Sequence, residues 1–266
     1  MKNKKILTII TIVLSVLITI GAVVATIWLV GSLIGCMTPA VGETESYDFG
    51  ADFLPSSLEI EVGGAEIRIE RGDKFLVESN LKYLEVTNRV EGVLVKEKKH
   101  PSSDYEGAFL TIYIPEGVSF GELDITTGAG TLYAKSLSAE VIDFELGAGE
   151  VIIDSLVATR EASIEGGAGK VTIGGGSLRD LDLAMGVGEL DLTTEIVGEG
   201  ELALGVGQAT LRLLGDPDSY TLKMNKGIGD ITYNGSSVGV NQIIGIGATE
   251  VKIDGGIGSI TIFTEQ

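Results

Sequence analysis

Few residues in this chain have side chains that could carry catalytic chemistry. His100 is the only histidine and Cys36 is the only cysteine. His100 lies in the charged stretch KEKKHP, residues 96–101, where we expect an exposed loop rather than a catalytic base. A single cysteine excludes an internal disulfide framework, and a single histidine excludes a multi-histidine metal site. We therefore predict no metal, no cofactor and no enzyme activity.

Paired carboxylates are the remaining catalytic candidates. Asp180 with Asp182, and Glu189 with Asp191, are spaced as neighbours on one face of a strand, and two carboxylates could serve a glycosidase. Acids that alternate with apolar residues are more typical of a strand's solvent face. Aromatic rings, on which sugars stack, make up only 6% of the chain. A polysaccharide-active enzyme thus ranks as the last alternative.

The most regular feature is a signature of Gly, a small or aliphatic residue, then Gly. It occurs in eight copies, and the steps between their first glycines are 19, 20, 19, 19, 22, 18 and 11. Seven copies supply the predicted corner glycines Gly128, Gly130, Gly147, Gly149, Gly167, Gly169, Gly186, Gly188, Gly205, Gly207, Gly227, Gly229, Gly245 and Gly247, and the eighth is Gly256-Ile257-Gly258. A dinucleotide fingerprint needs a helix after its glycines, but strand-like sequence follows every copy. Calcium-binding nonapeptide repeats need an Asp that these copies lack.

The residues around each signature alternate between apolar and polar, as in Leu181, Leu183 and Met185 before one copy and Leu190 and Leu192 after it. This period of two predicts strands. The near-constant step predicts an all-β solenoid, or β-helix, of about 19-residue coils. Gly allows positive φ and close backbone approach, so the signatures should form stacked corners. The middle residue is Ala, Val or Ile and is expected to point into the core.

The N-terminus has the pattern of a membrane anchor. Residues 6–34 contain no charge, a run long enough to span a bilayer with tilt. Lys2, Lys4 and Lys5 precede it and acids follow, which places the N-terminus in the cytoplasm and the rest outside. Two alternatives stay open: full secretion, and a lipoprotein signal, because Leu33-Ile34-Gly35-Cys36 resembles a lipobox and would make Cys36 a lipidation site.

These observations predict five segments. They are a cytoplasmic basic tail at 1–5, a transmembrane anchor or lipoprotein signal at 6–35, a linker at 36–54, irregular β-coils forming an N-terminal cap at 55–122, and the Gly-x-Gly solenoid at 123–266. Within the cap, Gly63-Gly64 looks like a degenerate first copy of the signature, and strands are expected at 75–78, 83–87, 93–96 and 109–114. Ser259–Thr264 should form the last strand at the open end of the solenoid, with Ile260 and Ile262 inward. Residues 43–266 carry 16 basic and 38 acidic groups, a net charge of −22. Such a surface should repel nucleic acid and could attract a basic partner. Repulsion between coils favours a monomer.

Two short motifs have ordinary explanations. Arg71-Gly72-Asp73 spells an integrin-binding tripeptide, but such tripeptides arise by chance at turns. Asn234-Gly235-Ser236 fits a glycosylation acceptor, which matters only in a host that glycosylates.

Residues 110–119, LTIYIPEGVS, followed by 123–130, LDITTGAG, and by further Gly-Ala-Gly strands, resemble the bacterial "putative adhesin" family. The resemblance covers most of residues 45–265. It implies a β-solenoid displayed on the surface of Gram-positive cells, often behind one membrane helix. Some relatives are encoded near cell-envelope stress systems. The family has no established catalytic residues, so none is assigned to this chain.

Together, these features predict a membrane-anchored, extracytoplasmic β-solenoid that acts by binding. The first hypothesis is an adhesive or envelope-associated interaction module. The second is a regulatory partner in an envelope-stress system that meets another membrane protein.

Overall fold

We analysed a computed structural model, which describes residues 39–90, 92–100, 102 and 104–264. The chain divides into two compact units: Met1–Ala40 with Pro101–Asp104, and Val41–His100 with Tyr105–Gln266. In the first unit, the Ala40 amide donates to the Asp104 carbonyl oxygen at 2.9 Å. The predicted basic tail, membrane anchor and lipidation site at Cys36 all lie outside the described residues. No helix among the described residues is long and apolar enough to cross a membrane.

The prediction of an all-β chain is confirmed for the described part of the second unit. Its strands belong to one open 13-stranded sheet with the order β1-β3-β6-β2-β7-β8-β13-β10-β11, to which β4, β5, β9 and β12 attach. The only helical element in this described part is a single 3-10 turn, η1 (Pro217–Ser219). The strands are β1 Val41–Asp48, β2 Ser57–Gly72, β3 Leu76–Leu81, β4 Leu84–Arg89, β5 Gly92–Glu97, β6 Phe109–Pro115, β7 Phe120–Ile173, β8 Gly176–Leu213, β9 Tyr220–Asn225, β10 Ile228–Tyr233, β11 Ser236–Ser237, β12 Gln242–Ile244 and β13 Thr249–Thr264.

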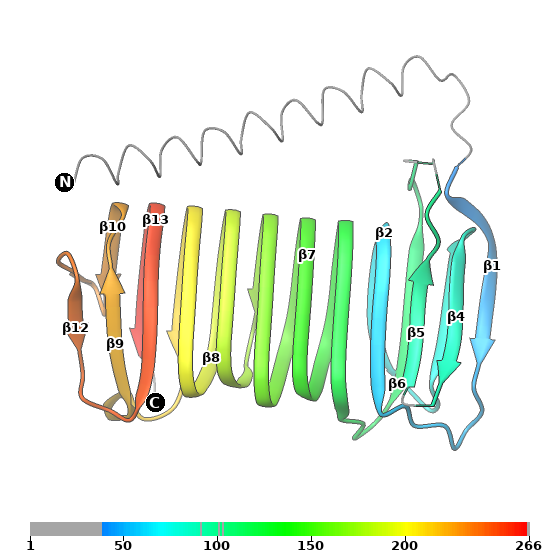
Figure 1. Cartoon of the computed structure of the whole chain (residues 1–266), viewed down its shortest axis with the longest axis horizontal. Coiled ribbons are helices and arrows are strands. Elements are labelled where there is room, and N and C mark those ends of the chain that lie inside the picture. The colour runs from blue at the N-terminus through cyan, green and yellow to red at the C-terminus, as the bar shows by residue number, and fades with distance from the viewer. Residues whose placement is uncertain (1–38, 91, 101, 103, 265–266) are drawn as a thin grey trace, which may run out of the picture. The chain divides into compact units, whose positions relative to one another are not determined.

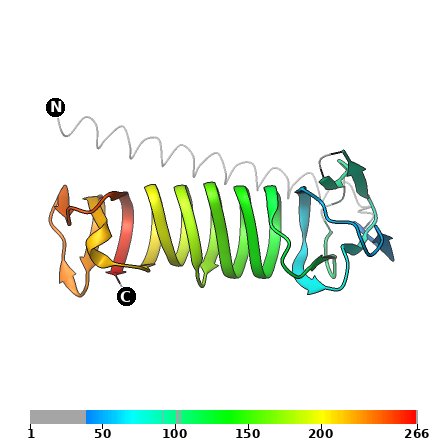
Figure 2. The ribbon, with the colours of Figure 1, turned by 90° about the horizontal axis from the view of Figure 1, so that it is seen from below.

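Two of these strands are far longer than an ordinary strand, because each runs through several repeats. β7 has 54 residues and β8 has 38. We call one repeat of the chain a pass. The passes pair in parallel and in register: Gly169 lies opposite Gly188, and Val171 lies opposite Leu190, in each case one repeat further along the chain. Figures 1 and 2 show the passes of β7 and β8 following one another along the unit.

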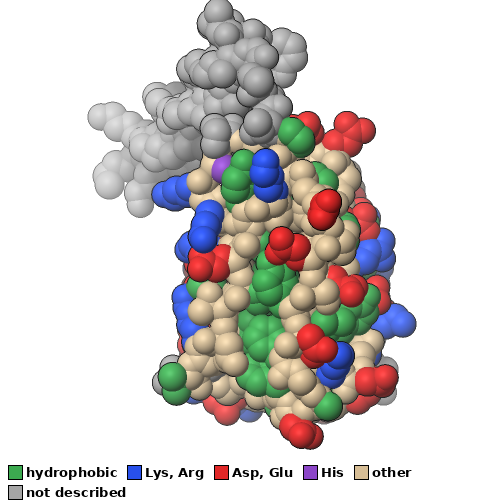
Figure 3. Space-filling model, turned by 90° about the vertical axis from the view of Figure 1, so that its right-hand side faces the viewer, with side chains coloured by type: hydrophobic (Ala, Val, Ile, Leu, Met, Phe, Trp, Pro, Cys, Tyr) green, Lys and Arg blue, Asp and Glu red, His purple; other side chains and the backbone are tan. Residues whose placement is uncertain are grey.

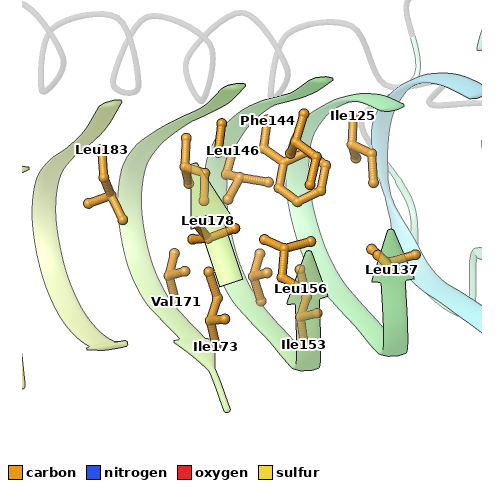
Figure 4. Packing of buried hydrophobic residues seen from close by; sticks show 14 of the residues in the cluster. Ile125, Leu137, Phe144, Leu146, Ile153, Leu156, Val171, Ile173, Leu178 and Leu183 are labelled. Carbon is orange, nitrogen blue, oxygen red and sulfur yellow. The ribbon is translucent and has the colours of Figure 1, made fainter. Parts of the chain in front are cut away.

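The period-two alternation places one set of side chains inside. Leu183, Leu190 and Leu192 are buried, whereas Asp182, directly before Leu183, and Glu189, directly before Leu190, are exposed. Figure 4 shows Leu, Ile, Val and Phe side chains of successive passes packing against one another. No single pass could enclose these residues, so neighbouring passes supply the contacts that bury them.

The N-terminal part contains the four predicted strands near 75–78, 83–87, 93–96 and 109–114, observed as β3, β4, β5 and β6. The prediction of a linker at 36–54 is wrong over Val41–Asp48, because these residues form β1 and pair antiparallel with β3. Sequence reasoning missed β1 because most of its side chains are exposed. Backbone hydrogen bonding at a sheet edge, rather than burial, holds it.

The C-terminal part does not follow chain order. We expected Ser259–Thr264 to form the last, open-ended strand, and this is wrong. β13 lies inside the sheet, where it pairs in parallel with β8 on one side and with β9 and β10 on the other. Ile260 and Ile262 are buried as expected. In the sequence, β9 to β12 therefore come before β13. In the sheet, β13 lies between β8 on one side and β9 and β10 on the other.

Candidate binding surface

The signature glycines stack on one another across successive passes. A Cβ at Gly188 would lie 1.8 Å from the Gly169 carbonyl oxygen, and Gly188 has a φ of +148°. Any side chain there would overlap the neighbouring backbone in a conformation that L-residues rarely adopt. First glycines of the signature are equally confined: a Cβ at Gly147 would meet the Gly128 carbonyl oxygen. Glycine thus lets the passes approach closely at this corner.

Six of the seven copies with predicted corner glycines join this ladder, and so does the eighth. The spatial order ends with Val206 beside Ile257, and Ile257 beside Ile228. The copy Gly245-Ile246-Gly247 stays outside, in a loop where a Cβ at Gly247 would meet the Ser219 backbone. The degenerate copy near Gly64 does join, with Gly64 opposite Ala129.

The middle residues of the signature point outward, contrary to the prediction that they enter the core. Val187 and Ile257 are each 44% exposed, and Ile228 is 58% exposed. Both neighbouring glycines lack side chains, so nothing covers the middle residue. We call this set the Gly-x-Gly row; in spatial order it consists of Ala129, Ala148, Ala168, Val187, Val206, Ile257 and Ile228.

The Gly-x-Gly row is long and its side chains change systematically. Seven positions at the usual strand spacing extend over about 30 Å. Side-chain size increases along the row from Ala through Val to Ile. Most surface apolar residues of soluble proteins are scattered singly, whereas a contiguous set marks an interaction surface.

An open groove lies beside the row. Its volume is about 760 Å³, and Leu146, Met185 and Leu204 contribute apolar side chains to its lining. Glu145 and Glu165 also line the groove and are exposed. The surface thus combines an apolar strip with carboxylates at its edge, which suits a ligand that has both apolar and basic groups.

A second cluster is dominated by charged side chains. Glu59, Glu122 and Asp124 line a cavity of about 460 Å³, where Arg89 forms an ion pair of 2.5 Å with Glu59. Burial, then repulsion from Asp143 and the surrounding glutamates, raises the pKa of Asp124 to about 6. Within the described residues, no group of three or more His, Cys, Asp or Glu is arranged to hold a metal ion.

His100 is buried, and the prediction of an exposed loop histidine is wrong. Only 5% of its side chain and 3% of that of Glu97 are exposed. His100 Nε2 lies 2.6 Å from Glu97 Oε1, and the His100 ring stacks on Tyr83 with centroids 4.4 Å apart. Tyr105 donates to Glu97 Oε2 at 3.2 Å; burial, followed by the Glu97 charge, raises the Tyr105 pKa to about 12.

This network also reaches strand β2. The Gly63 amide donates to Glu97 Oε2 at 2.8 Å, which ties the network to the first, degenerate signature. Since a Cβ at Gly63 would overlap the Tyr105 hydroxyl, the missing side chain makes room for the ring. Sequence reasoning missed this because Glu97 and Tyr105 carry no periodic signal.

The two short motifs have structural roles. The Arg71 guanidinium donates to the carbonyl oxygens of Pro115 and Ser136, at 3.2 and 3.0 Å, so it joins neighbouring segments. Asn234 and Gly235 have φ of +45° and +78° and form the two-residue turn between β10 and β11.

No family model matches the chain, and no curated protein matches it. Among solved structures, a "putative adhesin" from Bacteroides fragilis is similar over 85% of this chain and 99% of that chain, with 12% identity and a TM-score of 0.52. A "putative cell adhesion protein" from Clostridium sporogenes has 16% identity over 84% of this chain and 99% of its own, with a TM-score of 0.35. A "putative adhesin" from Parabacteroides distasonis has 11% identity over 86% and 100%, with a TM-score of 0.33. The first likeness shows a shared fold alone.

Proposed function

We propose that this protein is a membrane-anchored, extracytoplasmic β-solenoid that binds a partner along its Gly-x-Gly row. The in-register parallel pairing of equivalent positions in neighbouring passes, such as Gly169 with Gly188, supports the solenoid. The observation that carries the binding function is the exposure of aliphatic side chains on a glycine corner, as at Val187, Ile257 and Ile228. A side chain needed only for folding would be expected inside.

The partner that fits this surface has apolar groups flanked by basic ones. Glu145 and Glu165 border the groove on one side of the row. On the other side lie Glu189 and Asp230, each next to the second glycine of its signature, and they form ion pairs with Lys170 and Lys226. The carboxylates on the groove side attract cationic groups and steer their approach, while the aliphatic strip supplies apolar contact. Binding should therefore weaken as salt increases, though it should not vanish.

The location outside the cytoplasm is part of the proposal. It is supported by the uncharged run at 6–34, by the three lysines before it, and by the fold shared with a protein described as an adhesin. Protease added to intact cells with a permeable wall should remove residues after 43. Full protection of those residues would contradict this topology.

A binding comparison tests the function. The full chain, purified in a non-ionic detergent, is mixed with isolated cell envelopes, and the bound fraction is measured for wild type, Val187→Glu and Val90→Glu. Val187 belongs to the row, whereas Val90 is fully exposed elsewhere and serves as the matched control. We expect Val187→Glu to lower affinity about tenfold or more and Val90→Glu to retain it. Equal binding by all three proteins would contradict the proposal.

The envelope-stress hypothesis is a specific form of the same activity. If the partner is a membrane protein, it should co-purify with the wild-type chain and be lost with Val187→Glu. If the partner is wall polymer, envelopes stripped of protein should retain binding.

A further inference from the structure

The C-terminal end of the sheet differs in charge from the rest of the chain. Residues 231–249 contain no Asp, Glu, Lys or Arg, and this is the longest uncharged run after residue 43. The run includes β11 and β12, and Figure 1 shows β12 outermost at this end. We call residues 236–248 the C-terminal cap.

The C-terminal cap exposes large aliphatic side chains. Val240 is 72% exposed, Ile243 is 63% exposed and Ile246 is 100% exposed. Val238 and Ile244 of the same segment are buried or half-buried, so the cap closes the core with one set of side chains and presents another to solvent. β12 pairs only with β9 among the described strands, which leaves its second edge available for pairing.

The opposite end of the unit is densely charged. Glu43, Glu45 and Asp48 lie on β1, the strand at that end of the sheet. Figure 3 shows this end with apolar side chains at the centre and acidic and basic ones around them. A head-to-tail contact would press these charges against the uncharged C-terminal cap, which offers them no charged partner in exchange for water, and this is costly.

We infer that two copies of this chain associate cap to cap, through residues 236–248, as a closed two-fold dimer. Two copies of the cap can meet without removing any charged side chain of residues 236–248 from water, and they bring exposed aliphatic side chains of both copies together. The monomer prediction rests on repulsion between the acidic side chains of the passes. The cap has no charged side chains, so this repulsion does not act between two caps. Because the same patch is used on both copies, the contact closes and does not propagate into filaments. This inference does not depend on the Gly-x-Gly row.

Sedimentation of the full chain in non-ionic detergent, over a concentration series at low and high salt, tests the inference. Wild type should form a dimer whose dissociation constant falls as salt screens the remaining charge. Ile243→Lys and Ile246→Lys should each raise that constant about tenfold or more. Val187→Lys, an equally drastic change on the Gly-x-Gly row, should leave it unchanged.

Cross-linking tests the geometry with the apolar cap side chains intact. In a Cys36→Ser chain, Ala248→Cys should form a disulfide-linked dimer on mild oxidation, and Val90→Cys should not. Four results would each overturn the inference: a chain that stays monomeric at every concentration, filaments, a dimer indifferent to both isoleucine variants, or, in a mixture of the two cysteine variants, cross-links between position 248 of one copy and position 90 of another. Envelope binding that fails while the dimer persists would contradict only the proposed function.

Discussion

At the scale of single residues, the glycines matter in this protein because they have no side chain. At Gly188 the absent Cβ allows the Gly169 carbonyl to approach, and on either side of Val187 it leaves the valine side chain uncovered. The same residue type therefore permits close stacking and exposes the apolar row.

Replacing a stacked glycine should therefore destabilise the fold. Gly188→Val forces a branched side chain into a positive-φ position that the neighbouring backbone already fills, and should lower the free energy of unfolding by about 1–3 kcal/mol. Glu189→Gln, next to it and exposed, should change stability by less than about 0.5 kcal/mol. Urea unfolding of the full chain in detergent measures both. Equal losses would argue against glycine-dependent stacking.

Asp124 should give stability a recognisable pH dependence. Its folded pKa of about 6 lies above the ordinary value of 3.8, so the ionised carboxylate destabilises the folded state. That penalty is fully present above pH 6, shrinks as the pH falls through 6, and is gone below 3.8. Asp124→Asn should be more stable than wild type at pH 8 by about 1 kcal/mol, a value reduced for solvent screening.

The stability difference between Asp124→Asn and wild type should close by about pH 4. Thermal unfolding of both proteins across this pH range makes the comparison. A difference that stays constant with pH would show that the effect is steric and not electrostatic.

Residue-level prediction worked where a side chain follows the repeat. Leu183 and Leu190 are buried as their alternation indicates. The prediction failed for Val187. An aliphatic side chain is expected in the core, but the glycines on both sides of Val187 leave it exposed. The repulsion between Asp124 and Asp143 does have a signal in the sequence, because the two acids occupy equivalent positions in neighbouring repeats.

At the scale of elements, the repeat predicts where the strands lie in the sequence better than it predicts which strands pair with one another. The passes of β7 and β8 follow chain order, as a constant step requires. The shortened final step, from Gly245 to Gly256, predicts a terminal strand, whereas β13 pairs with β8, β9 and β10. The local sequence does not distinguish a strand that lies between two others from a strand at the end of the sheet, because both have the same alternation of apolar and polar residues.

Removing β13 tests this inserted order. A chain that ends at Ala248 should lose the parallel partner of β9 and β10, so residues 214–248 should become sensitive to protease. Residues 57–213 should stay resistant, since their passes support one another. Limited proteolysis followed by mass spectrometry locates the cuts. Continued protection of residues 220–233 in the shortened chain would contradict the inserted position of β13.

At the scale of the whole molecule, the two ends and the corner have different properties. The β1 end carries acids, the C-terminal cap carries none, and the Gly-x-Gly row between them is aliphatic with carboxylates beside it. Fold class followed from periodicity and composition. Which surfaces are exposed and apolar could not be predicted, because that depends on how the passes stack and where β13 inserts.

A protection footprint tests the central claim, that the Gly-x-Gly row is the binding surface. In a Cys36→Ser full chain, Val206→Cys on the row and Val90→Cys away from it are labelled with a hydrophilic maleimide, with and without bound envelopes. We expect envelopes to slow labelling at position 206 about tenfold and to leave position 90 unchanged. Equal labelling of position 206 in the free and bound states, with binding intact, would contradict the claim.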